Sequence, residues 1–156
     1  MQLQDQPPHL VATFYRVSLK AIIFDEQRRL LVYQNAEDEW EMPVGGWEQG
    51  ESAEDCLRRE LKEEVNATVT EVGNVLSVYS LFHSGGNWKL CIAYEVKIAD
   101  GALVPDGDEV AKCAYVAQEE FMRLPFNPNE AAIIDHAESI WSESERSKKL
   151  IPGEME

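Results

Sequence analysis

The chain has few of the features that mark secreted, membrane-bound or disulfide-stabilised proteins. It contains only three cysteines, Cys56, Cys91 and Cys113, which lie far apart and form no Cys-x-x-Cys pair. An odd number of dispersed cysteines favours reduced thiols and therefore a cytoplasmic protein. The longest apolar runs are far shorter than a membrane span. The N-terminal sequence MQLQDQPPHL has neither the basic start nor the apolar stretch of a signal peptide.

Basic residues are also scarce, since 14 lysines and arginines stand against 29 acidic residues, which gives a net charge of −15. This balance argues against binding to DNA, which requires a basic surface. A small phosphorylated ligand remains compatible with it, because a metal ion and a few cationic side chains can meet its charge locally.

The length of 156 residues, of which 44% are apolar, suits one domain with its own core. We find no internal repeat. Residues 1–12 are predicted to form an N-terminal arm, in which Pro7 and Pro8 interrupt regular structure. Residues 13–141 are predicted to form the single domain, and residues 142–156 a polar, mobile tail.

The hydrophobic pattern predicts alternating strands and helices, and hence an α/β protein with a mixed sheet and helices on both sides. Residues 17–24 and 30–34 read as two strands of a hairpin. Further strands are expected at residues 68–82, 88–98 and 110–116, and helices at residues 53–65, 118–124 and from residue 127 to about 141.

Two of these segments carry more specific expectations. In the helix, Ser52 is the expected N-cap, and Leu57, Leu61 and Val65 form a stripe that should face the core. In the strand 88–98, the even-numbered residues from Trp88 to Ile98 are apolar, so we expect them to form a buried face. The same strand would suit a homodimer contact, although core packing explains it equally well.

Three carboxylates, Glu60, Glu63 and Glu64, share one face of the predicted helix. Such like charges repel each other unless a cation sits against them, and a hard divalent ion such as Mg²⁺ takes oxygen ligands of this kind. The alternative is a solvated acidic surface that Arg58, Arg59 and Lys62 neutralise through local pairs.

The segment from Gly45 to Ala67 resembles the Nudix box, G-x5-E-x7-R-E-U-x-E-E-x-G-U, where U is a bulky aliphatic residue. Two positions depart from this pattern: Asn66 stands in place of glycine, and Ala67 in place of the aliphatic residue. Asparagine tolerates the left-handed backbone conformation at a helix end, so the first departure is mild. The residues that fall on the pattern are Gly45, Glu51, Arg59, Glu60, Leu61, Glu63 and Glu64.

The resemblance implies a Nudix-type α/β/α sandwich with a mixed β-sheet, and hydrolysis of a nucleoside diphosphate linked to another group. In this family water attacks a phosphorus atom of the pyrophosphate, with Mg²⁺ or Mn²⁺ at the phosphate oxygens. By this resemblance, Glu60 and Glu64 are expected to be metal ligands, and Glu63 is expected to be a further ligand or the general base. We interpret Arg59, four residues before Glu63, as the side chain that orients it.

Other candidate site residues have weaker signals. Glu51 either contacts the metal network or favours the start of the helix. The backbone of Gly45 and Gly46 is expected to lend a carbonyl to the ion or to make a tight turn, and the two roles are compatible. Glu109 is the candidate for a fourth acid from outside the box. Aromatic residues that could stack on a base are Tyr33, Trp40, Trp47 and Trp88, of which we expect one to contact the ligand.

Besides the hydrolase, two further functions remain possible from the sequence. A non-catalytic Nudix module that senses a nucleotide would use the same fold, although the acidic set of the box is complete here. A third option is isopentenyl diphosphate isomerisation, for which the sequence offers only unpositioned cysteines. The sequence does not specify which nucleotide derivative is the substrate.

Overall fold

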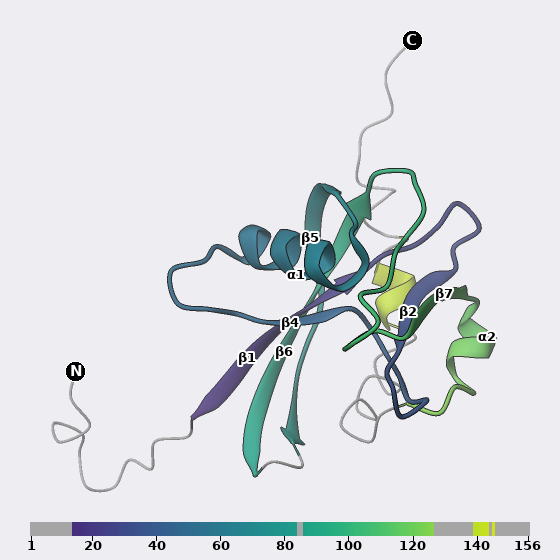
Figure 1. Ribbon diagram of the computed structural model, residues 1–156. Coiled ribbons are helices and arrows are strands. Elements are labelled where there is room, and N and C mark those ends of the chain that lie inside the picture. The colour runs from purple at the N-terminus through teal and green to yellow at the C-terminus, as the bar shows by residue number, and fades with distance from the viewer. Residues whose placement is uncertain (1–13, 84–85, 127–138, 144, 146–156) are drawn as a thin grey trace, which may run out of the picture.

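The computed structural model describes residues 14–83, 86–126, 139–143 and 145, and contains two β-sheets and two named helices (Figure 1). A four-stranded mixed sheet has the order β4 (Val44–Gly46), β1 (Tyr15–Ile22), β6 (Asn87–Ile98) and β5 (Val69–His83). A three-stranded antiparallel sheet has the order β3 (Trp40–Glu41), β2 (Leu30–Gln34) and β7 (Lys112–Val116). The helices are α1 (Ala53–Val65) and α2 (Gln118–Phe121).

The predicted strands are all present, but one predicted pairing forms only in part. We expected residues 17–24 and 30–34 to form a hairpin, but they pair only next to the turn, through an antiparallel bridge between Phe24 and Leu30 and a hydrogen bond of 2.9 Å from the Leu31 amide to the Ile23 carbonyl. The reason is that both edges of β1 are already occupied, by β4 on one side and by the parallel strand β6 on the other. Strand β2 pairs instead with β3 and β7, which creates the second sheet.

Two apolar clusters hold the layers together. One lies between α1 and the sheets, where Cys56, Leu57, Leu61 and Val65 pack against residues such as Leu19. The other lies on the opposite face and brings together residues from β1, β5 and β6 with α2 and residues 139–143, which have helical backbone. The α/β class, with a mixed sheet and helices on both faces, is therefore confirmed (Figure 1).

Helix α1 begins and ends as its sequence predicts. The Ser52 hydroxyl accepts a hydrogen bond from the Asp55 amide at 3.1 Å, which satisfies one free donor of the first turn. At the other end Asn66 adopts the left-handed conformation, with φ 55° and ψ 29°. Asparagine thus fulfils the role of the glycine in the family pattern, as expected. The predicted stripe of Leu57, Leu61 and Val65 is buried.

The burial of β6 differs from the prediction. The residues that are completely buried at its centre are Cys91 and Ala93, on the face expected to be the more polar one. The predicted face is covered by the cluster beneath α1 only in part, and Trp88 near the hairpin end remains 43% exposed. Figure 1 shows that the β5–β6 hairpin extends well beyond α1, so its tip lacks this cover.

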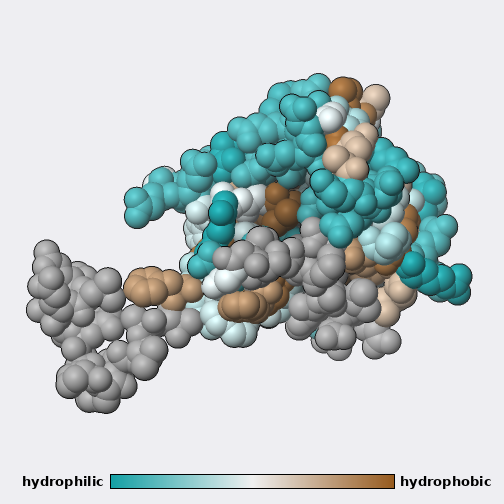
Figure 2. All heavy atoms as spheres, turned by 60° about the horizontal axis from the view of Figure 1, so that its bottom comes forward, coloured by the Kyte–Doolittle hydropathy of each residue, from teal (hydrophilic) through white to brown (hydrophobic). Residues whose placement is uncertain are grey.

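Several predictions fall outside the described residues. These are the N-terminal arm, nearly all of the polar tail and residues 127–138 of the last predicted helix, although Ile140 and Trp141 from its end are buried as expected. None of the three cysteines forms a disulfide bond within the described residues. Within the described ranges no helix has the length and apolar character needed to cross a membrane. Hydrophilic side chains cover much of the face shown in Figure 2, around a central hollow with apolar side chains.

Candidate active site

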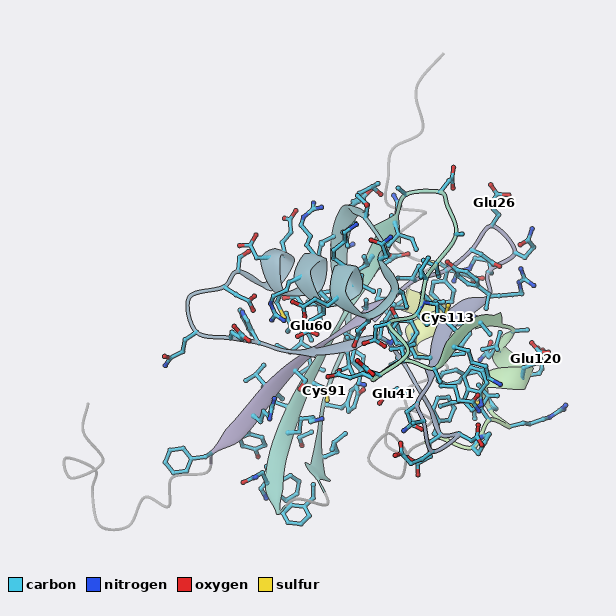
Figure 3. The ribbon with its side chains drawn as sticks, in the orientation of Figure 1. Glu26, Glu41, Glu60, Cys91, Cys113 and Glu120 are labelled. Atoms are coloured by element: carbon cyan, nitrogen blue, oxygen red, sulfur yellow. The ribbon has the colours of Figure 1, made fainter. Side chains whose placement is uncertain are left out.

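The acidic face of α1 lies directly against β4, and Gly45 makes this approach possible. A Cβ atom at residue 45 would lie 1.9 Å from Glu60 Cγ, far inside contact distance. Gly45 pairs with Leu19 within the sheet, so it is not the residue of a tight turn. Figure 3 shows Glu60 on the side of α1 that faces β4. The glycine therefore leaves the space that the Glu60 side chain occupies.

Arg59 connects the loop before the helix to the acidic face. Its Nε and Nη2 atoms donate to the two carboxylate oxygens of Glu51 at 2.6 and 2.9 Å, and its Nη1 donates to Glu60 at 2.6 Å. A further bond of 3.2 Å reaches the Gly46 carbonyl. The distance to Glu63 is longer, 3.6 Å. Arg59 thus orients Glu51 and Glu60 more closely than Glu63, the partner that we expected.

Of the two roles predicted for Glu51, contact with the metal network and support of the start of the helix, its geometry favours the second. Its carboxylate accepts from Arg59 and also from the backbone amide of Glu48 at 3.2 Å. The hydrogen bond from Arg59 is the main reason why the pKa of Glu51 falls to about 2. Glu51 therefore stays ionised and fixes the loop that precedes α1.

Glu64 has the least favourable environment of the acidic residues. The residue is only 7% exposed, and its Oε2 atom has no hydrogen-bond partner among the described residues. Burial, followed by the charges of Glu60, Glu41 and Glu109, raises its pKa to about 9, and Lys20 opposes this shift. A buried carboxyl group without a partner is destabilising, which fits a group whose partner is a bound cation.

A pocket of about 320 Å³ gathers the acidic side chains beside β4. Glu109 lies there, so the structure brings the predicted fourth acid to the residues of the box. Asp106 and Arg16 also line the pocket, and sequence reasoning missed both. The complete lining is Arg16, Val44, Gly45, Gly46, Glu60, Glu63, Glu64, Asp106 and Glu109.

Glu109 reaches this pocket because the loop between β6 and β7 is tied to the end of α1. The amides of Val104 and Asp106 donate to the carbonyls of Val65 and Glu64, both at 2.9 Å. The Asp106 carboxylate then accepts from the amides of Asp108 at 3.1 Å and Val110 at 2.9 Å. The Asp-Gly-Asp-Glu sequence at residues 106–109 is a turn signal that hinted at this arrangement.

The residues of the pocket fit a divalent cation in their chemistry, although they do not form a closed cage. Within the described part of the chain no three acidic, histidine or cysteine side chains converge closely enough to be a preformed metal site. Arg59 holds Glu60 instead. The carboxylate oxygens, and the unsatisfied oxygen of Glu64 in particular, are the ligand type that Mg²⁺ and Mn²⁺ prefer.

None of the three predicted tryptophans, Trp40, Trp47 and Trp88, lines the acidic pocket. Trp40 packs against the apolar cluster that includes α2, and the Lys112 ammonium lies 5.6 Å from the centre of its ring. The Trp47 indole donates to the Glu51 carbonyl at 3.0 Å. Trp88 lines a neighbouring pocket, but its ring packs against Tyr15 and Phe82. Tyr33, the fourth aromatic candidate, is buried, and burial raises the pKa of its phenol.

Comparison with known proteins identifies the class to which this fold and site correspond. The family model of the NUDIX domain matches residues 14–137, so the chain belongs to the Nudix hydrolase family. It is 34% identical over 83 residues to the NAD-capped RNA hydrolase NudC of Pseudomonas fluorescens, an alignment that covers 53% of this chain but only 28% of that protein.

Solved structures give the same fold. The MutT protein from Methanosarcina mazei superimposes with a TM-score of 0.72 at 18% identity, covering 86% of this chain and 99% of that one. A UDP-X diphosphatase superimposes with a TM-score of 0.73 at 20% identity, covering 89% of this chain and 67% of that one. At these identities the likeness concerns the fold rather than the substrate.

Proposed function

We propose that this protein is a divalent-metal-dependent pyrophosphohydrolase that cleaves a nucleoside diphosphate linked to another group. The observation that carries the proposal is the buried, unpartnered oxygen of Glu64 in a pocket that also contains Glu60 and Glu109. A protein gains nothing in stability from such an arrangement, so a cationic ligand is its simplest explanation.

In the proposed reaction the oxygen of a water molecule forms a bond to one phosphorus atom as the bridging P–O bond of the anhydride breaks. The products are two phosphate-terminated molecules, and the proton of the water passes to a base. Bound Mg²⁺ or Mn²⁺ would neutralise phosphoryl charge and lower the pKa of the attacking water.

The residues of the chain would divide these tasks by their positions. Glu60, Glu64 and Glu109 would hold the cation, and the carbonyl of Gly45, which lines the same pocket, is a further candidate ligand. Glu63 lines the pocket with a side chain that is 62% exposed, which suits a base that exchanges its proton with solvent. Arg59 would hold Glu60 and the loop that precedes α1 in position.

The substrate class is inferred from the family and its relatives. The named relatives act on an NAD cap and on UDP derivatives, and both substrates contain a pyrophosphate joined to a nucleoside. We propose the same group for this chain, as a nucleotide sugar, ADP-ribose or a nucleoside triphosphate. The three cysteines, which form no disulfide bond within the described residues, support a cytoplasmic location.

The proposal is tested by a screen of nucleotide derivatives with Mg²⁺ or Mn²⁺, with release of a nucleoside monophosphate as the readout. We expect turnover that chelation abolishes and that Glu64→Gln lowers at least about a hundredfold. Glu54→Gln is the matched control, because Glu54 lies on the same helix and pairs with Arg58 at the surface.

The screen also separates the alternative, a nucleotide-sensing module without turnover. Tight binding of an intact nucleotide, with no hydrolysis at any metal concentration, would establish it in place of the enzyme.

A further inference from the structure

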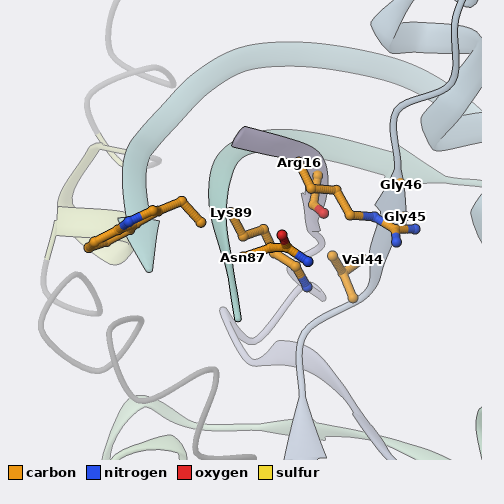
Figure 4. Close-up of a pocket in the computed structure, with 8 residues that line it drawn as sticks. Arg16, Val44, Gly45, Gly46, Asn87 and Lys89 are labelled. Atoms are coloured by element: carbon orange, nitrogen blue, oxygen red, sulfur yellow. The ribbon is translucent and has the colours of Figure 1, made fainter. Parts of the chain in front are cut away.

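A second pocket adjoins the acidic pocket and has the opposite charge. Its volume is about 370 Å³, and it shares Arg16, Val44, Gly45 and Gly46 with the acidic pocket. Its other lining residues include Ser18, Asn87 and Lys89. Figure 4 shows Arg16 extending toward Gly45 and Gly46 on β4, with Asn87 and Lys89 beside Val44. The two pockets are thus neighbours along β4.

The two cations of this pocket are placed side by side by the sheet. Arg16 on β1 and Lys89 on β6 are direct partners in the parallel ladder, so their side chains leave the same face. Like charges in this position repel each other. Neither side chain has an acidic partner within the described ranges, whereas Lys97 on the same strand pairs with Glu71 at 2.6 Å.

The surroundings of these cations suit an anion. Ser18 is 3% exposed and contributes a hydroxyl group to the lining, and Asn87 contributes an amide. The guanidinium of Arg16 lies against Gly46, where an added Cβ would be 3.2 Å from Nη2. Arg16 is also part of the acidic pocket, so an anion bound to it would adjoin the proposed cation site.

We propose that Arg16 and Lys89 form a subsite for a phosphoryl group next to the metal-binding acids. The inference rests on the proposed hydrolase function and makes its substrate class specific. Two cations favour a substrate that carries an additional charged phosphoryl group, as a nucleoside triphosphate does, over one that carries a neutral sugar at that place.

The first test compares two substrates with the same nucleoside, UTP and UDP-glucose, in the presence of Mg²⁺. For the wild-type protein we expect kcat/KM to be at least about tenfold higher with UTP. Arg16→Ala and Lys89→Ala should each lower kcat/KM for UTP about tenfold, the effect of one lost charged hydrogen bond, and should lower kcat/KM for UDP-glucose by a factor at least about threefold smaller. Equal losses on both substrates, or a preference for UDP-glucose, would overturn the proposal.

The matched controls are Lys97→Ala on the same strand and Arg123→Ala at the surface beyond α2, and neither should change the ratio of the two substrates. Because the second pocket does not depend on turnover, a binding measurement separates this proposal from the proposed function. Inorganic triphosphate with Mg²⁺ should bind the wild-type protein at least tenfold more tightly than the Arg16→Ala, Lys89→Ala double variant.

The two measurements give distinguishable failures. If inorganic triphosphate binds both proteins equally, or binds neither, the phosphoryl subsite is wrong, whatever the screen of nucleotides shows. If it binds in the predicted way but no nucleotide is hydrolysed, the subsite stands and the hydrolase function falls.

Discussion

Gly45 and Glu60 are so close that a methyl group on residue 45 would lie 1.9 Å from Glu60 Cγ. One residue belongs to β4 and the other to α1, so this contact sets the separation between the strand and the acidic face of the helix. Because the conflict extends from Glu60 Cγ through Cδ to Oε1, at 1.9, 2.3 and 2.7 Å, the whole side chain would have to adopt another conformation.

Gly45→Ala is therefore expected to displace Glu60 and to lower the free energy of unfolding by about 1–3 kcal/mol, as overpacking of a filled site does. Urea unfolding measures this change, and the activity of the variant should fall with it. Gly46→Ala is the comparison, because the added methyl group would meet only the end of the Arg16 side chain at 3.2 Å. Equal stability of both variants and the wild type would contradict this explanation of Gly45.

Arg59→Lys should fail to replace arginine even though it keeps the charge. A lysine ammonium cannot bind both oxygens of Glu51 while it also reaches Glu60. We expect kcat to fall by about a hundredfold, as misplacement of a site by about 1 Å does. Arg58→Lys on the exposed side of the helix should leave kcat unchanged. Full activity of Arg59→Lys would show that charge alone is needed.

The stability of the metal-free protein should decrease as the pH rises from about 4.5 to about 9. Glu64 has an ordinary pKa of 4.5 and a pKa of about 9 in the folded state. Between these values the unfolded chain ionises it freely while the folded state keeps it protonated, so a rising pH favours unfolding. Thermal unfolding at a series of pH values, in the presence of a chelator, measures this decrease in stability.

Glu64→Gln should lessen that slope and stabilise the metal-free protein at pH 8. An increase of roughly 3 °C in Tm or more is expected, the shift that about 1 kcal/mol produces in a domain of this size. The same variant should lose any increase in Tm on addition of Mn²⁺. Glu54→Gln should behave like the wild type, and an identical pH dependence of all three proteins would refute the burial argument.

Asp106→Ala should impair the site from outside the Nudix box. The carboxylate of Asp106 accepts hydrogen bonds from the amides of Asp108 and Val110, and these bonds hold Glu109 at the acidic pocket. Their loss should cost about 1 kcal/mol of stability and lower the activity at least tenfold, with most of the activity recovered in Asp106→Asn. Asp108→Ala, which removes only an exposed side chain, should have little effect on kcat/KM.

The parts of the structure that the sequence predicted well depend on local signals. The ends of α1 follow from Ser52 and Asn66, whose side-chain and backbone preferences act within a few residues. Its buried stripe follows from helical spacing, and the place of Glu60, Glu63 and Glu64 on one face follows with it. The family pattern then identified Glu51 and Arg59 as parts of the same site.

The remaining features depend on contacts between distant segments. The pairing of β2 with β7 instead of β1 is decided by which strand edges are free, and no local pattern records this. Arg59 prefers Glu51 over Glu63 because the preceding loop folds back onto the helix. Arg16 belongs to the site only because its strand, β1, lies between β4 and β6 in the sheet, and both of these strands are distant from β1 in the sequence.

The central claim is that the buried Oε2 atom of Glu64 has no hydrogen-bond partner among the described residues because a divalent cation binds there. Calorimetric titration of the protein with Mn²⁺, in the presence of a nonhydrolysable nucleotide, tests this most directly. We predict saturable uptake by the wild-type protein and by Glu54→Gln, and a loss of that uptake in Glu64→Gln. Equal uptake by all three proteins, or none by the wild type, would contradict the account.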